Sequence, residues 1–156
     1  LDPLHTGALR ELAALYLQQG RPQAVEALLA PALAQTPDEP AWRLLLAGAK
    51  LAGNQTEAAY GLLNARIPAL AGHHDYHAVL AALEQQLGHY DTAAGRYAAL
   101  VREDAAQATW WLGLGLALDA RGRGSEAITA YRRALNLNQL DGAARAHAEQ
   151  RVAAGG

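Results

Sequence analysis

The segment His73-His74-Asp75-Tyr76-His77 carries the one group of side chains that suggests a metal site. On a helix, His73 and His77 share a face because they are four residues apart, and Asp75 adds a nearby carboxylate. The same segment also suits the start of a helix, where an acidic side chain favours the positive end of the helix dipole. We interpret His77 as a packing residue, so the sequence predicts neither a metal nor any other cofactor.

Nucleophilic chemistry has few candidates in this chain. Cysteine is absent, which excludes disulfides, thiolate metal sites and cysteine nucleophiles. Ser125 is the single serine, and no histidine lies near it in the sequence. Gly113 and Gly115 form a Gly-x-Gly string without the preceding strand and third glycine of a phosphate-binding loop. The sequence therefore predicts a protein that is not an enzyme.

Charge and hydropathy exclude two further classes of partner. The 156 residues include 13 Lys and Arg against 15 Asp and Glu, so no cationic excess favours nucleic acid. The longest apolar stretch, from Trp110 to Leu118, is about half of the ~20 residues that span a bilayer, so we expect no membrane insertion. The chain begins at Leu1 and lacks methionine, and we interpret it as a piece of a longer polypeptide whose targeting segment is missing.

The elements that position these side chains are predicted to be helices in a repeating pattern. Alanine and leucine dominate, and β-branched residues are few. Four turn glycines, Gly20, Gly53, Gly88 and Gly122, lie 33, 35 and 34 residues apart. Around them the same spacing of small and large apolar residues recurs. The second copy, for example, is assigned Trp42, Leu45, Leu46, Ala58, Leu62 and Ala65, and the fourth Trp111, Leu114, Gly115, Leu118, Ala127, Tyr131 and Ala134.

This pattern resembles the tetratricopeptide repeat, a helix–turn–helix unit of about 34 residues. The resemblance implies an all-α fold, a right-handed solenoid of stacked helix pairs in one domain, residues 1–156. The repeats are predicted at about 6–38, 39–73, 74–107 and 108–140, with a capping helix at about 141–154 whose N-cap is Asp141. The segment 67–73 is irregular, and we expect extra curvature there.

Three side chains gain an interpretation from this pattern. Trp111 is in phase with the buried stripe and is expected in the core, whereas Trp110 and Tyr76 precede the stripe by one residue and are expected at junctions between repeats. Glu84 stands where the other copies have Tyr16 or Leu118. A carboxylate at such a semi-buried position needs a hydrogen-bonding or ion-pair partner. We expect this partner to be His77 or an arginine from a neighbouring helix.

The remaining candidate site is a groove lined by the first helices of the repeats. It is predicted to begin with cations, to continue with amides and to end with apolar side chains and a carboxylate, which suits an extended or helical peptide with an acidic end. The candidate partner-binding residues are Arg10, Gln18, Arg43, Lys50, Asp75, Gln85, Gln86, Leu112, Leu116 and Asp119.

The last third of the chain resembles a more particular group. Trp110-Trp111 and the closing Gln150-Arg151 are similar to the C-terminal repeats of MshN-type proteins of bacterial mannose-sensitive haemagglutinin (type IV) pilus biogenesis. That resemblance implies a scaffold of a bacterial envelope complex, in the periplasm or at the inner membrane. Alternatives that stay open are a cytoplasmic location, a substrate-recruiting appendage of a larger enzyme, and a self-assembling scaffold in which Leu1 and Leu4 contribute one contact surface.

Overall fold

The computed structural model describes residues 3–37 and 39–155, with side chains from residue 7 onward. Over these residues the chain is all-α and contains no strand, as the sequence predicts. The helices are α1 (Pro3–Gln18), α2 (Pro22–Gln35), α3 (Pro40–Ala52), α4 (Thr56–Asn64), α5 (His74–Gln86), α6 (Tyr90–Glu103), α7 (Ala108–Ala120), α8 (Gly124–Asn136) and α9 (Gly142–Ala154). The proposed contact surface of Leu1 and Leu4 lies outside the described side chains.

Helix starts follow local chemistry. Pro22 and Pro40 stand in the first turn of α2 and α3, where a missing backbone N–H costs no helical hydrogen bond. The Glu39 side chain accepts a hydrogen bond from the Ala41 N–H at 3.3 Å. Asp141 accepts one from the Ala144 N–H at 2.9 Å, which confirms it as the N-cap of α9.

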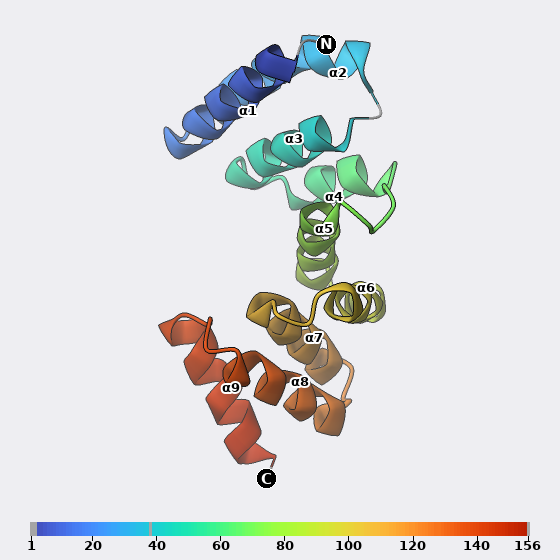
Figure 1. Ribbon diagram of the computed structural model, residues 1–156, viewed down its shortest axis with the longest axis vertical. Coiled ribbons are helices and arrows are strands. Elements are labelled where there is room, and N and C mark those ends of the chain that lie inside the picture. Colours follow the sequence, from blue (N-terminus) through green and yellow to red (C-terminus); the bar gives the residue numbers. More distant parts are fainter. Residues whose placement is uncertain (1–2, 38, 156) are drawn as a thin grey trace. The chain divides into compact units, whose positions relative to one another are not determined.

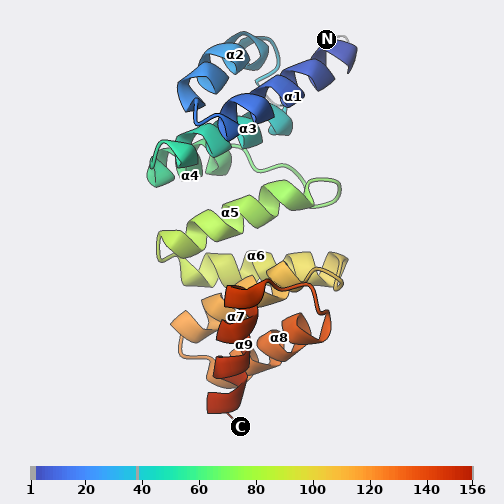
Figure 2. The same cartoon turned by 90° about the vertical axis from the view of Figure 1, so that its left-hand side faces the viewer.

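The helices form two compact units, residues 1–68 (unit 1) and 69–156 (unit 2). In unit 1, α1 pairs with α2, α3 pairs with α4, and α2 packs against α3. In unit 2, α5 pairs with α6 and α7 with α8, α6 packs against α7, and α9 packs against α8 (Figures 1 and 2). That residues 1–156 form a single domain stays a prediction.

The repeats are more regular than the turn glycines indicate. The left-handed turn positions are held by Gly20, Asn54, Gly88 and Gly122, with φ of 67°, 57°, 80° and 71°, and each lies 34 residues from the next. Gly53 has φ −89° and is not the equivalent residue. The predicted phase of the second repeat is therefore wrong by one residue, because asparagine as well as glycine tolerates this backbone conformation. We call these four residues the turn residues.

Burial supports the corrected phase. The residue seven positions before each turn residue is small and fully buried or nearly so: Ala13, Ala47, Ala81 and Gly115. The residue five positions after it is also buried: Val25, Ala59, Ala93 and Ala127. Ala59 and Leu63, and not the predicted Ala58 and Leu62, supply the buried side chains of α4. The spacing predicts the repeat correctly, but the second copy must be moved by one residue.

The core of unit 2 combines tyrosine rings with glycines. A Cβ atom at Gly113 would meet the Tyr97 ring at 2.4 Å, and one at Gly115 would meet the Tyr131 ring at 2.6 Å. The two glycines thus leave room for the rings on the second helices. Unit 1 has Leu29 and Leu63 at the positions of these tyrosines, and both are fully buried. The two units therefore fill the same repeat positions with different shapes.

The aromatic residues also follow the corrected phase. Trp42, Tyr76 and Trp110 each lie twelve residues before a turn residue, and the first two are 1% and 2% exposed. Trp110 is half-buried, with its ring centroid 5.8 Å from that of His74. Trp111 packs against the core of unit 2 but is likewise only half-buried. The expectation that Trp111 lies in the core is therefore only partly confirmed.

Candidate functional site

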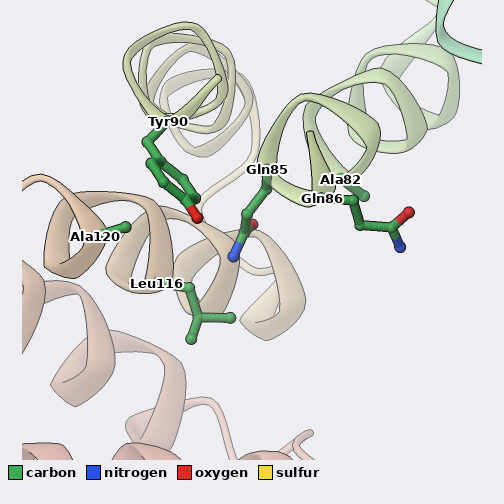
Figure 3. A pocket seen from close by; sticks show the side chains of 6 residues that line it. All are labelled: Ala82, Gln85, Gln86, Tyr90, Leu116 and Ala120. Atoms are coloured by element: carbon green, nitrogen blue, oxygen red, sulfur yellow. The ribbon is translucent and has the colours of Figure 1, made fainter. Parts of the chain in front are cut away.

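A hollow of about 500 Å³ opens in unit 2 on the first helices of its two repeats. We call it the groove hollow. Its lining comes from three helices: Ala82, Gln85 and Gln86 of α5, Tyr90 of α6, and Leu116 and Ala120 of α7 (Figure 3). Gln85, Gln86 and Leu116 are three of the residues predicted for a partner-binding groove, and the fold brings them to one place. Figure 3 shows the polar ends of Tyr90 and Gln85 turned toward one another.

The lining of the groove hollow is uncharged. The amides of Gln85 and Gln86 and the Tyr90 hydroxyl both donate and accept hydrogen bonds. Leu116 and the two alanines supply apolar surface without bulk. Such a surface matches the backbone amides and one apolar side chain of an extended peptide.

Charges beside the groove hollow are paired with one another. The Arg151 guanidinium donates to both carboxylate oxygens of Asp119, at 2.6 and 2.7 Å, and the Tyr131 hydroxyl donates to the same carboxylate at 3.0 Å. Arg121 pairs with Asp91 at 2.6 Å. The Arg151 hydrogen bond lowers the pKa of Asp119, and burial raises the pKa of Tyr131. Asp119, predicted as a groove residue, thus fastens α9 to α7.

The other two predicted groove residues of unit 2 do not line this hollow. Leu112 is half-buried and packs against the core of the unit. Asp75 is exposed in the first turn of α5, where a carboxylate favours the helix dipole. Their contact with a partner stays a prediction.

In unit 1, the three predicted groove cations already have partners. Arg43 is 8% exposed, and its guanidinium donates to the Arg66 carbonyl at 2.9 Å. Lys50 pairs with Glu26 at 3.3 Å. Arg10 Cζ lies 5.9 Å from the centroid of the Trp42 ring, and Arg10 Nη2 lies 4.0 Å from Glu39 Oε1.

The corrected phase explains why Arg43 and Lys50 bind partners within the protein and are not free for a ligand. These two residues stand at the repeat positions of His77 and Glu84, on the buried stripe and not on the groove face. Leu44 and Leu51 take the groove positions instead. Arg10 and Gln18 of α1 are exposed and remain at groove positions. The cationic beginning of the groove is thus reduced to Arg10.

A charged cluster lies inside unit 2 at Glu84, which is fully buried. Arg96 of α6 donates to both carboxylate oxygens, with Nε to Oε2 at 3.0 Å and Nη2 to Oε1 at 2.8 Å. A third nitrogen, Nη1, lies 3.1 Å from His77 Nδ1, which accepts in the neutral imidazole. The expectation that an arginine from a neighbouring helix pairs with Glu84 is confirmed. Burial, with the Glu84 charge, raises the pKa of Tyr97 to about 12.

The histidines of the segment 73–77 point to separate partners. His73 Nδ1 lies 3.1 Å from the Ala69 carbonyl, His74 packs on Trp110, and His77 faces Arg96. Within the described ranges, no group of three or more potential ligands gathers at a point that could hold a metal ion. His77 is 7% exposed, as a packing residue should be.

Sequence reasoning missed Tyr90 and Ala120 as members of the groove hollow. Ala120 lies two residues before its turn residue, as Gln86 does, so the repeat itself could have indicated it. Tyr90 is the first residue of the second helix, outside the first-helix positions from which the groove was predicted. An aromatic residue two positions after the left-handed Gly88 was the available signal.

The helix pairs, their 34-residue interval and the small buried residues define an α-helical repeat protein. The chain belongs to the tetratricopeptide repeat family: models of this repeat match residues 1–47, 16–83 and 79–148. Proteins of this class bind other proteins through the surfaces of their stacked helices. No curated protein matches the sequence. Among the described helices, none is long and apolar enough to cross a membrane.

Solved structures of MamA proteins are similar to the chain in fold. MamA of strain AMB-1 is 22% identical, with a TM-score of 0.75 over 93% of this chain and 88% of that one. MamA of Desulfovibrio magneticus RS-1 is 19% identical, with a TM-score of 0.74 over 84% and 74%. MamA of strain MSR-1 is 22% identical, with a TM-score of 0.67 over 86% and 77%. At these identities the likeness concerns the tetratricopeptide solenoid fold alone.

Proposed function

We propose that this protein is a non-enzymatic scaffold that holds an extended segment of a partner protein in the groove hollow. The observation that carries the proposal is the uncharged lining formed by Gln85, Gln86, Tyr90 and Leu116. About 500 Å³ is within the usual size of ligand sites in proteins and accepts a few residues of peptide.

The chemistry of the lining indicates what the partner segment contains. Amide and hydroxyl groups pair with the peptide backbone, and Leu116 with Ala82 and Ala120 receives one apolar side chain. Because Asp119 and Asp91 are neutralised by Arg151 and Arg121, the hollow neither attracts nor repels a charged segment strongly. We therefore propose a neutral, apolar-anchored segment, and binding that depends little on salt.

Site-specific photo-crosslinking tests this proposal. A photoreactive residue in place of Gln86, an exposed member of the lining, should crosslink a defined partner in a lysate of the source organism. The same residue at Arg132, exposed on α8, should not. Leu116→Glu should abolish the crosslink. Leu15→Glu is the matched control, because Leu15 is an exposed leucine of unit 1 and 46% accessible. Equal crosslinking with Leu116→Glu would reject the groove hollow as the docking site.

Two alternative functions predict different results in the same experiment. A self-assembling scaffold would crosslink to a second copy of this chain, and its mass in solution would rise with concentration. An appendage of a larger enzyme would crosslink to a substrate that the full-length protein then converts. No carboxylate, histidine or serine lines the groove hollow, so we expect the chain itself to show no turnover in either case.

As the biological setting we propose assembly of a bacterial envelope complex such as a type IV (MSHA-like) pilus. Support comes from the paired Trp110-Trp111 and the closing Gln150-Arg151, which are similar to MshN-type proteins. Under this proposal the partner is another component of the pilus machinery in the periplasm or at the inner membrane. Identification of the crosslinked partner by mass spectrometry tests the setting separately from the docking site.

A further inference from the structure

A second hollow of about 310 Å³ opens in unit 2 where α7 begins and α8 ends. We call it the tryptophan hollow. Trp111 of α7 and Ala105, which precedes that helix, line one part of it. Arg133, Asn136 and Leu137 at the end of α8 line the rest. None of these residues lines the groove hollow, so the two hollows are separate candidate sites.

Trp111 presents a fixed aromatic surface to the tryptophan hollow. At the same repeat position, eleven residues before the turn residue, Arg43 and His77 are buried. Trp111 is only half-buried, so part of its side chain stays accessible beside the hollow. Its indole N–H donates to the Ala105 carbonyl at 2.9 Å, which fixes the ring and uses its single donor. The ring therefore offers an occupant a surface for packing and no hydrogen bond.

The hydrogen-bonding groups of the tryptophan hollow come from α8. Arg133 and Asn136 are three residues apart on this helix and hence neighbours on its surface. The guanidinium donates hydrogen bonds, and the amide both donates and accepts them. Over the described residues neither side chain has a hydrogen-bond or ion-pair partner. The hollow thus combines an aromatic surface from one helix with unoccupied polar groups from the next.

The end of α8 selects against an anionic occupant. Arg133 stands in the last turn of α8, where the helix dipole is negative and the positive side chain compensates it. The last carbonyls of a helix also lack intrahelical donors, so they favour groups that donate hydrogen bonds. A hydroxyl group can donate to such carbonyls and can accept from Arg133, whereas a carboxylate or phosphate can only accept. This place therefore suits a neutral ligand rich in hydroxyl groups.

We propose that the tryptophan hollow binds a neutral sugar ring of a glycan. In a pyranose with equatorial hydroxyl groups, the ring hydrogens form an apolar face, and their partial positive charge favours the negative π-face of Trp111. The hydroxyl groups at the edge of the ring accept from Arg133 and exchange hydrogen bonds with Asn136. Leu137 adds apolar contact. This site does not depend on the groove hollow.

Other small occupants match the tryptophan hollow less well. A nucleotide stacks its base on a tryptophan ring, but its phosphate brings negative charge to the negative end of α8. An apolar side chain of a peptide covers Trp111 and leaves Arg133 and Asn136 without partners. The volume of about 310 Å³ lies at the lower end of the range for small-molecule sites and accommodates a monosaccharide or a disaccharide.

NMR titration of the whole chain with methyl β-glucopyranoside and methyl β-cellobioside tests the proposal. Each should shift the indole signal of Trp111 and the backbone signals of residues 133–137, with a Kd on the order of 1–10 mM. The indole signal of Trp42, which is buried in unit 1, is the internal control and should not move. A tighter cellobioside assigns the ring to a polysaccharide chain, and equal affinities assign it to a single sugar at a chain end, as on a glycosylated protein.

Three further probes separate a sugar from other occupants. Sorbitol carries hydroxyl groups without a ring face, adenosine monophosphate carries a base with a phosphate, and acetyl-leucine carries an apolar side chain with a carboxylate. Each should bind at least ~tenfold more weakly than the glycosides. Stronger binding of any of the three, or an unmoved Trp111 signal with both glycosides, would overturn the proposal.

Variants of the lining locate the binding site. Trp111→Leu keeps an apolar side chain and removes the ring, and it should weaken the glycosides at least ~tenfold, as followed by the signals of residues 133–137. Asn136→Ala changes an exposed side chain that the fold does not use, and it should weaken them about three- to tenfold. The matched control Arg132→Gln, exposed on the same helix, and Leu116→Glu in the groove hollow should leave sugar binding unchanged. Unchanged affinity with both Trp111→Leu and Asn136→Ala, or an equal loss with either control, would refute the site.

Discussion

Unit 1 and unit 2 solve the same packing problem with different side chains. At the position nine residues after the turn residue, unit 1 has Leu29 and Leu63, and unit 2 has Tyr97 and Tyr131. At the position four residues before it, unit 1 has a half-buried Lys50, and unit 2 has a fully buried Glu84. The comparison teaches that this repeat specifies the volume and spacing of its interior, and leaves polarity to the particular pair of helices.

The buried carboxylate of unit 2 offers the strongest way to break the comparison. Glu84→Ala should destabilise unit 2 by about 3–5 kcal/mol, because Arg96 would remain inside without its counter-charge. Hydrogen exchange under increasing urea, resolved by segment, should show the loss in α5 and α6. Replacing the pair together, as Glu84→Leu with Arg96→Leu, should recover most of it. A loss below about 1 kcal/mol for Glu84→Ala would mean that water reaches the cluster.

Glycines in the two units should respond to alanine in opposite ways. Gly113→Ala places a Cβ atom 2.4 Å from the Tyr97 ring, and such overpacking costs about 1–3 kcal/mol. Gly48→Ala in unit 1 makes an ordinary contact of 3.5 Å with Leu17 and should gain up to about 1 kcal/mol from helix propensity. Urea unfolding followed by circular dichroism measures both. Similar changes for the two variants would show that the tyrosine rings move aside freely.

Acid should loosen α9 before it affects unit 1. The Arg151 hydrogen bond lowers the pKa of Asp119 in the folded protein, so this carboxylate stabilises the fold above its unfolded pKa of about 3.9. The stabilisation is lost as pH falls through the lower folded value. The protection of the α9 amides, relative to the exchange rate of an unstructured chain at the same pH, should therefore fall below about pH 4. Asp119→Asn should show fast exchange of α9 already at neutral pH, and an unchanged pH profile in this variant would contradict the assignment.

The smallest effect is expected at the ion pair of unit 1. Lys50 and Glu26 are 26% and 45% exposed, and a pair of this kind contributes about 0–1 kcal/mol. Lys50→Met should therefore leave stability within about 1 kcal/mol and remove what salt dependence the pair gives. Thermal unfolding at low and high salt tests this. A loss as large as that of Glu84→Ala would erase the distinction between the two units.

Sequence patterns predicted the helices, the repeat and the pairing of Glu84, because each depends on local spacing or on the cost of a buried charge. They did not assign the phase of the second repeat, since Gly53 and Asn54 are adjacent and either can adopt a left-handed turn. Because of this one-residue difference, Arg43 and Lys50 were predicted in the groove, whereas the structure places them on the buried stripe.

The groove hollow was only partly predictable for a similar reason. Gln85, Gln86 and Leu116 follow from the first-helix positions, but Tyr90 enters from the second helix, and the pairing of Asp119 with Arg151 joins residues 32 positions apart. Contacts of that separation depend on how helices pack and leave no local signature. The irregular segment before α5 was expected, while its effect on curvature stays a prediction.

The constant interval between Gly20, Asn54, Gly88 and Gly122 has a genetic consequence. A duplication or deletion of one whole 34-residue repeat, with its ends at these turn residues, preserves which side of its helix every downstream side chain occupies. A gain or loss of one codon within a helix rotates the remainder of that helix by about a hundred degrees and exposes its apolar stripe. The chain is therefore built to change length in evolution by complete hairpins.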